Sequence, residues 1–187
     1  RAYAELEQRN WELQRLSLLD GLTGLANRRH FDEFLSAELA RSMRSHYHLG
    51  LILLDVDFFK RYNDHYGHPA GDVCLRQIAR VLAGEVQRVT DLPARYGGEE
   101  FAVVLPASSA EGAMAVAERI RQAILTCAMP HAHSDIAPVV TISVGVAVHA
   151  VQPGDTLQTV IEQADAALYQ AKRSGRNCVV FHAAAFT

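Results

Sequence analysis

The chain has 187 residues, a formal net charge of −3, and a content of 49% hydrophobic and 21% charged residues. This balance is that of an ordinary globular domain, so it excludes disordered and fibrous classes. The small negative charge gives no global indication of binding to nucleic acid or to an anionic membrane. Any chemistry on phosphate groups must therefore depend on local arrangements of residues.

The three cysteines, Cys74, Cys127 and Cys178, are far apart and show neither paired nor zinc-site spacing. This indicates a reduced, cytoplasmic setting. No apolar run approaches the roughly 18 residues that span a bilayer, and no secretory leader is recognisable. Because the chain begins at Arg1 rather than Met, we expect a fragment of a longer protein, with membrane or sensor segments in the missing part.

The first segment, residues 1–19, is polar, and a series of its residues falls at alternating spacings of three and four, namely Tyr3, Leu6, Asn10, Leu13 and Ser17. It predicts a helix that either contributes a weak coiled-coil seam or packs on its own domain. Residues 20–24 interrupt this helix, and Asn27 can cap a second one that contains Phe31, Leu35 and Leu39. We therefore expect an N-terminal helix over 1–19 and the domain proper over 20–187.

The run from His48 to Val56 is nearly continuously apolar and contains Asp55 at its end, which predicts a strand buried on both faces. Amphipathic helices are predicted over residues 71–89, 110–127 and 157–172. Further strands are predicted over residues 94–105, 139–148 and 178–181. The predicted fold class is α+β, with a central mixed sheet flanked by helices.

Gly97 and Gly98 stand between two strand-like runs and favour a two-residue type I′ turn, which needs positive φ at both central positions. Glu99 and Glu100 are then expected at the tip. If the strand with Asp55 lies beside this hairpin, two or three carboxylates meet and repel each other unless a divalent cation neutralises them. Such oxygen ligands favour Mg²⁺ or Mn²⁺. In isolation, the same residues would simply form a solvated turn.

The stretch 55–72 supplies an acid at a strand end, small turn residues and Lys60. A tight loop here could hold phosphates through backbone amides and this lysine. Neither the P-loop pattern nor the GxGxxG pattern occurs, so phosphate binding is expected to depend on a metal together with this loop.

Five segments, in order, resemble the GGDEF domain of the diguanylate cyclase family, namely residues 20–29, 55–72, 95–101, 143–145 and 165–177. The resemblance implies a fold similar to nucleotidyl cyclases and polymerase palm domains. It also implies an enzyme that condenses two GTP molecules into cyclic di-GMP and releases two pyrophosphates. Each protomer of a homodimer would hold one GTP. The N-terminal helix would carry a signal from an upstream sensor domain, and no nucleic-acid partner is expected.

By the same resemblance, Asp55, the main-chain carbonyl of Val56 and the Glu99-Glu100 pair would bind Mg²⁺ or Mn²⁺, with two ions per active site. Adjacent carboxylates can divide the work between ligand and general base, and the sequence does not decide which does which. We assign Glu99 as the base and Glu100 as the ligand.

Asn63 and Asp72 match the guanine-reading residues of the family. His68 either joins this pocket or is a turn histidine satisfied by the backbone. The expected phosphate-binding groups are Lys60, Lys172, Arg176 and the backbone amides of Phe58 and Phe59. Asp57 and Asp64 are interpreted as structural.

Arg88 and Asp91 form an RxxD motif with five residues between Asp91 and Gly97, the register of an inhibitory product site in many members of the family. Arg119 is expected to join this site from the next helix. Feedback inhibition by cyclic di-GMP is therefore expected, the alternative being a surface ion pair of little energetic value. His131 and His133 are interpreted as part of a surface turn.

Two other functions are compatible with the same fold. The first is a noncatalytic GGDEF module that binds GTP or cyclic di-GMP as a signalling receptor. The second is a palm-type cyclase that acts on a single triphosphate. The complete set of acids, guanine readers and cations favours the two-GTP enzyme over the first. The guanine pair and the register of Arg88 and Asp91 argue against the second.

Overall fold

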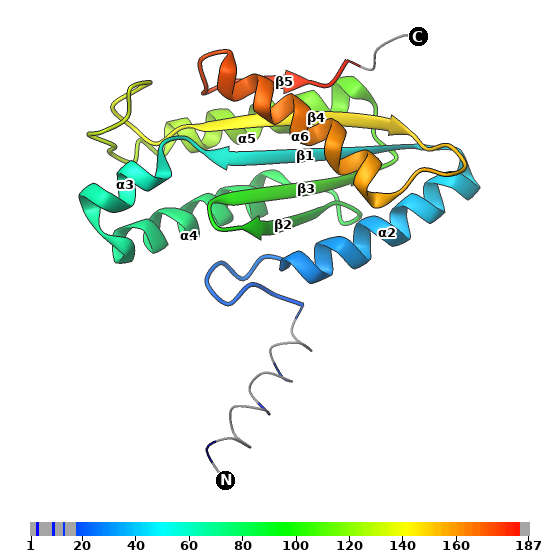
Figure 1. Cartoon of the computed structure of the whole chain (residues 1–187), viewed down its shortest axis with the longest axis horizontal. Helices are drawn as coiled ribbons and strands as arrows, with labels where there is room; N and C mark the ends of the chain where they lie inside the picture. The colour runs from blue at the N-terminus through cyan, green and yellow to red at the C-terminus, as the bar shows by residue number, and fades with distance from the viewer. Residues whose placement is uncertain (1–2, 4–8, 10–12, 14–17, 184–187) are drawn as a thin grey trace.

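The computed structural model describes residues 18–183 together with positions 3, 9 and 13 (Figure 1). The helices are α2 (Arg28–Ser45), α3 (Phe59–Tyr66), α4 (His68–Glu85), α5 (Ala110–Thr126) and α6 (Leu157–Arg173). The strands are β1 (His48–Val56), β2 (Leu92–Gly97), β3 (Glu100–Pro106), β4 (Ile142–Ala150) and β5 (Val179–Phe181). The strands form one mixed sheet in the order β2-β3-β1-β4-β5, which confirms the predicted fold class.

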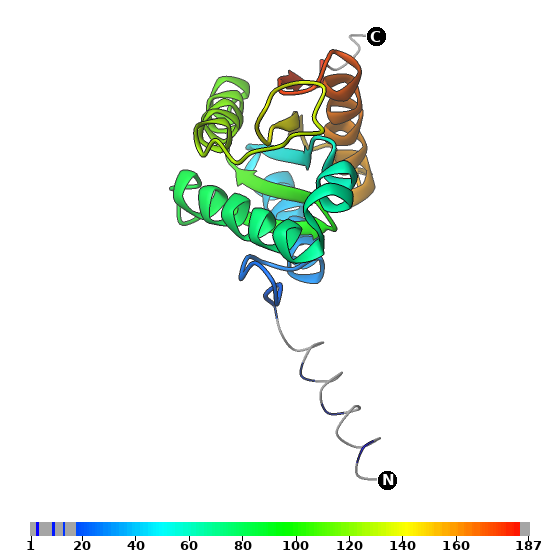
Figure 2. The ribbon, with the colours of Figure 1, turned by 90° about the vertical axis from the view of Figure 1, so that its left-hand side faces the viewer.

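The central strand β1 shows why the sheet is covered on both faces. Its alternate side chains divide between two cores, because successive residues of a strand point to opposite faces. Ile52 and Leu54 pack with α4 and α5, whereas Leu51 and Leu53 pack with α2 and α6. Figure 2 shows α5 and α6 on opposite sides of the sheet. A strand buried on both faces accounts for the continuous apolar run in the sequence.

Most predicted elements are confirmed within a few residues. The Asn27 side chain accepts a hydrogen bond from the amide of His30 at 2.9 Å and so caps α2 as predicted. Helix α4 begins earlier than the predicted Gly71, because Pro69 in the first turn needs no hydrogen-bonded amide. It ends at Glu85 rather than 89, since Val86 is extended.

Two predictions of local structure are wrong. The tight loop expected after Asp55 is instead a short turn followed by helix α3, in which Tyr62 stacks on Phe59 with ring centroids 5.9 Å apart and packs on Tyr66 at 4.6 Å. Strand β4 begins at Ile142 rather than 139 and extends to Ala150.

The predicted N-terminal helix over 1–19 lies largely outside the described residues, so the domain boundary near residue 20 stays a prediction. None of the helices in the described part of the chain combines the length and the apolar character that a bilayer crossing requires.

Candidate active site

The strand pairing brings the predicted acids to one edge of the sheet. β1 runs antiparallel to β3, and this register sets Asp55 directly opposite Glu100. The next residue, Val56, donates its amide to the carbonyl oxygen of Glu99 at 3.3 Å. Two carboxylates and the main chain of Val56 and Glu99 therefore meet where β1 ends.

The hairpin between β2 and β3 differs from the predicted one. Gly97 pairs with Glu100 across the strands, so Gly98 and Glu99 are the turn residues. Only Gly98 has positive φ, at +30°, and the predicted type I′ turn centred on Gly97-Gly98 is wrong. A register irregularity between Arg95 and Gly97 shifts the pairing by one residue.

Arg95 fixes this turn, although sequence reasoning assigned it no role. Its guanidinium donates to the carbonyl oxygen of Gly98 at 2.9 and 3.0 Å and lies 3.2 Å from a carboxylate oxygen of Asp20. Asp20 also accepts hydrogen bonds from the amide and hydroxyl of Thr23, at 2.9 and 2.7 Å. The hairpin is thereby tied to the turn that precedes α2.

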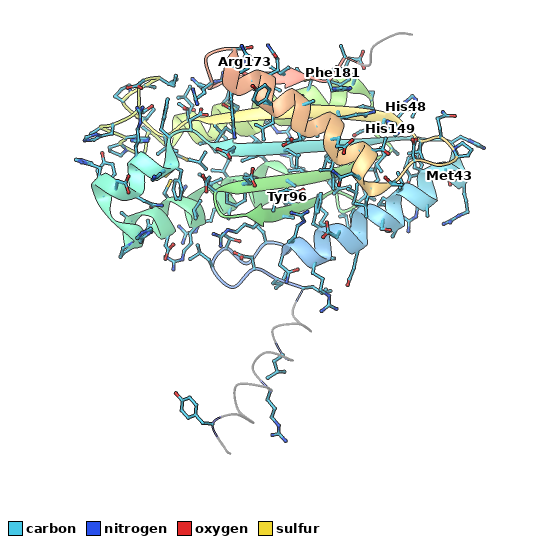
Figure 3. All side chains as sticks on the ribbon, in the orientation of Figure 1. Met43, His48, Tyr96, His149, Arg173 and Phe181 are labelled. Atoms are coloured by element: carbon cyan, nitrogen blue, oxygen red, sulfur yellow. The ribbon has the colours of Figure 1, made fainter. Side chains whose placement is uncertain are left out.

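Tyr96, in the irregular part of β2, anchors the hairpin from the opposite face. Its ring lies on the side of the sheet that α2 covers (Figure 3). The guanidinium of Arg28 is 3.8 Å from the ring centroid, and Phe31 meets the ring edge-on at 5.2 Å. Contacts of this kind stabilise an exposed pair by about 0.5–1 kcal/mol.

Asp55 is largely buried and lies among the charged groups of the site. Its side chain is only 14% exposed, and Nζ of Lys172 lies 3.1 Å from Oδ2. The pKa of Asp55 is raised to about 6, because burial raises it more than the nearby Lys172 lowers it, and Glu99 and Glu100 add smaller increases. Lys172, which is predicted to bind phosphate, contacts a predicted metal ligand in this structure.

The donor set fits a hard divalent cation, because it consists of carboxylate and carbonyl oxygens. Within residues 18–183, however, no three acidic, histidine or cysteine side chains are already arranged to enclose a metal ion. The positive charge beside Asp55 comes from Lys172. A cation bound at Asp55 would therefore compete with this contact of Lys172.

A cavity of about 500 Å³ opens beside the hairpin, a size suited to a small organic ligand. Its lining includes both predicted guanine readers, the predicted base and one predicted phosphate-binding cation. The lining residues are Phe59, Lys60, Asn63, Asp64, His68, Asp72, Leu75, Arg95, Gly98 and Glu99. The cavity brings together residues from α3, α4 and the hairpin.

Asn63 is the polar group in this cavity that most clearly needs a partner. Its Oδ1 atom is buried and has no hydrogen-bond partner in the protein. Gly71 makes room for it, since a Cβ at that position would lie 1.9 Å from Oδ1. A buried amide oxygen without a partner is costly. The same residue also lines the cavity, where its amide group would lie near a ligand.

Asp57 holds the turn after β1. It is 2% exposed and accepts hydrogen bonds from the hydroxyls of Thr141 and Ser143, at 2.7 and 2.6 Å, and from the amide of Asn177 at 3.1 Å. These contacts agree with the structural role interpreted from the sequence. They join β1, β4 and the turn after α6 at the site.

The turn itself is formed by Phe58, which adopts the left-handed conformation with φ of +53°. Two guanidinium groups, those of Arg61 and Arg176, each lie 4.5 Å from the centroid of its ring. Arg176, a predicted phosphate-binding residue, is therefore within reach of the turn that opens α3.

His131 is not part of a surface turn, and that interpretation is wrong for this residue. It is 1% exposed, and its Nε2 atom lies 3.2 Å from the carbonyl oxygen of Phe58. Only His133 is exposed, with its ring centroid 4.3 Å from that of His65. No signal in the sequence distinguished the two histidines.

The predicted inhibitory residues lie outside the cavity. Arg88 is about half exposed, and its Nη2 atom is 3.1 Å from Oδ1 of the buried Asp91. It also donates to Thr90 Oγ1 at 3.2 Å. Arg119, on α5, contacts Glu85 at 2.8 Å. The structure thus brings Arg88 and Asp91 together and joins Arg119 to the end of α4.

The sheet, the acids at its edge and the cavity with its unpaired amide define a domain suited to bind a nucleotide. The chain belongs to the diguanylate cyclase, GGDEF domain family, whose model matches residues 17–178. Enzymes of this family are generally metal-dependent.

Individual relatives agree with this assignment. The response regulator PleD of Caulobacter vibrioides is 44% identical over 169 residues, which cover 90% of this chain and 37% of PleD. The crystal structure of the GGDEF domain of DgcB from Caulobacter crescentus in complex with c-di-GMP has a TM-score of 0.80 at 38% identity, covering 89% of this chain and 94% of that one. Diguanylate cyclase SiaD of Pseudomonas aeruginosa, in complex with its activator SiaC, has a TM-score of 0.79 at 42% identity, with 97% and 68% covered. This chain thus spans just over a third of the length of PleD.

Proposed function

We propose that this domain is a diguanylate cyclase that condenses two GTP molecules into cyclic di-GMP and releases two pyrophosphates. The observation that carries the proposal is the convergence of Asp55, Glu99 and Glu100 beside a cavity that contains Asn63 and Asp72. Carboxylates supply metal and proton chemistry, and the amide-acid pair supplies recognition of a base. With GTP as the substrate, the domain would work in the cytoplasm.

In this proposal, Asp55, the Val56 carbonyl and the Glu99-Glu100 pair hold two Mg²⁺ or Mn²⁺ ions. When bound, such ions supply positive charge that stabilises the α-phosphate during attack. Glu99 lines the cavity, whereas Glu100 faces Asp55 across the strands. This difference supports Glu99 as the group that accepts the proton of the 3′-hydroxyl and Glu100 as a ligand.

The triphosphate would lie along the first turn of α3, because the first amides of a helix have no partner within it and attract anions. Phe58 and Phe59 would contribute these amides, and Lys60 would add charge from the cavity wall. Once a cation neutralises Asp55, Lys172 would leave this carboxylate and bind a phosphate oxygen. Arg176, which lies beside the ring of Phe58, would bind the phosphates as well.

The guanine base would be read by Asn63 and Asp72, with His68 at the edge of the same cavity. We expect Asp72→Asn to lower kcat/KM for GTP by about 10- to 100-fold, because a charged acceptor for guanine N1–H and the exocyclic amine is lost. The preference for GTP over ATP should fall as well. Steady-state kinetics with both nucleotides measure this. Asp64→Asn is the matched control, since Asp64 lines the cavity but is expected to contact no base; equal losses in the two variants would contradict the assignment.

Each domain would hold one GTP, so two copies must face each other before either can react. Residues 1–19 would act as the signalling helix that aligns them under an upstream sensor domain. Specific activity of the isolated chain should therefore rise with protein concentration.

Incubation with GTP and Mg²⁺, followed by chromatography of the nucleotides, tests the function. Formation of cyclic di-GMP supports the proposal. Binding of GTP without turnover would instead indicate the noncatalytic receptor, and a cyclic product of one GTP would indicate the other cyclase.

We further propose that Arg88, Asp91 and Arg119 form an inhibitory site for the product. Arg88→Ala is expected to weaken binding of cyclic di-GMP at least about tenfold, because a guanidinium contact to a phosphate or base is worth roughly 1.5–3 kcal/mol. Calorimetric titration of the product measures the affinity. Arg80→Ala, an exposed arginine on α4, is the control. Since Asp91 is buried, thermal unfolding must show that the variant is folded; unchanged affinity would remove this site from the proposal.

A further inference from the structure

The segment between α5 and β4 is attached to helix α3 at several points. Nη1 of Arg61 lies 2.7 Å from Oδ2 of Asp135, and the hydroxyl of Tyr66 accepts a hydrogen bond from the amide of Ala132 at 3.0 Å. His131 is the buried contact among these. Helix α3 is therefore held, from near its start to its last residue, by residues about 70 positions away in the sequence.

His131 is held in one orientation by its surroundings. Its amide donates to the carbonyl oxygen of Pro138 at 2.9 Å, and its ring meets Tyr62 edge-on with centroids 5.3 Å apart. Nε2 is 3.2 Å from the carbonyl oxygen of Phe58. Because a carbonyl can only accept, Nε2 carries the proton in this contact. Burial lowers the pKa of His131, in keeping with a neutral ring.

His131 contacts a residue that has an unfavourable backbone conformation. Phe58 has φ of +53° and ψ of +33°, and a left-handed residue other than glycine costs about 1–2 kcal/mol. Its carbonyl oxygen accepts two hydrogen bonds, from Tyr62 N at 3.1 Å and from His131. A strained backbone conformation persists only when contacts with the surrounding structure hold it in place.

We propose that His131 is a positioning residue: its Nε2–H holds the Phe58 carbonyl and so keeps the amides that open α3 in place for the triphosphate of GTP. This inference rests on the proposed function. His131 acts through Phe58 and touches no reacting atom. The α3 amides would contact the triphosphate equally before and during attack, so losing their alignment weakens binding more than turnover.

His131→Leu removes the donor at similar volume, and His131→Gln keeps an N–H that can reach the carbonyl. We expect His131→Leu to raise KM for GTP about fivefold, the effect of one lost hydrogen bond, with kcat changed less than about twofold. His131→Gln should recover most of the loss. His133→Ala, at an exposed histidine of the same segment, is the control and should match the unmodified chain.

Affinity for a non-hydrolysable GTP analogue and for GMP separates this role from a structural one. Weaker binding of the triphosphate with unchanged binding of GMP is expected in His131→Leu. A variant that only loses thermal stability, with KM and both affinities unchanged, would overturn the proposal. If His131→Leu does not fold, His131→Met is compared with His131→Gln by the same criteria. If the unmodified chain binds the analogue but makes no cyclic di-GMP, the proposed cyclase fails while the binding comparison still decides the role of His131.

Discussion

Replacing Asp55 with asparagine is expected to reduce formation of cyclic di-GMP by about 10³-fold or more, because the site loses the carboxylate around which the other acids gather. Asparagine has nearly the same shape but cannot neutralise a divalent cation. Initial rates of product formation at saturating GTP and Mg²⁺ measure the loss. Activity within tenfold of the unmodified chain would show that Asp55 is not a required ligand.

The same substitution is expected to leave the melting temperature unchanged or to raise it. Burial beside Glu99 and Glu100 raises the pKa of Asp55 to about 6, above the value of 3.8 for a free aspartate. A carboxyl group whose pKa is higher in the folded state destabilises that state once the pH is above both values. Asparagine removes this cost, and the partly exposed Lys172 can turn to solvent.

Asp57→Asn is the matched control, since it makes the same change two residues away. Asp57 accepts three hydrogen bonds in a buried position, and an amide can accept through only one oxygen. We expect this variant to lose about 1–3 kcal/mol of unfolding free energy. Equal melting temperatures for the two variants would contradict the distinction between a functional and a structural acid.

Much of the fold could be predicted because the pattern of apolar residues along the sequence agrees with the burial of those residues in the structure. Strand β1 was predicted with its observed bounds, since burial on both faces leaves a continuous apolar run. Helix α3 was missed because it has only eight residues and is polar apart from its aromatic residues. It follows the left-handed Phe58, whose conformation is supported by the contact of its carbonyl oxygen with the distant His131.

The acids of the site could be predicted, whereas their partners could not. Asp55 and the hairpin glutamates follow from a strand end and a turn signal. The contact of Lys172 with Asp55 joins residues 117 positions apart, and that of His131 with Phe58 joins residues 73 apart. The turn type was wrong because the irregular pairing at Arg95 moves the turn by one residue. Such features depend on packing between elements rather than on local periodicity.

Gly145→Ala is expected to destabilise the domain by about 3 kcal/mol, the upper part of the range for overpacked cores. Gly145 lies in β4 directly under α6. A Cβ there would be 2.2 Å from the amide nitrogen of Leu168 and 2.3 Å from the carbonyl oxygen of Ala164. Both are backbone atoms, so no side chain can rotate away and α6 itself must move. Urea denaturation measures the loss, and a variant within about 0.5 kcal/mol of the unmodified chain would show that α6 can shift at little cost.

Gly84→Ala is the matched control, because the same methyl group at this position of α4 would have no atom within 4 Å. It should stabilise the domain by about 0.5–1 kcal/mol, since alanine loses less backbone entropy than glycine in a helix. The contrast also tests the link to the active site. Helix α6 carries Lys172 beside Asp55, so a displacement of this helix in Gly145→Ala should move the proposed phosphate-binding lysine away from the site. Activity per folded molecule is therefore expected to be lower in Gly145→Ala than in the unmodified chain. Gly84→Ala should keep full activity.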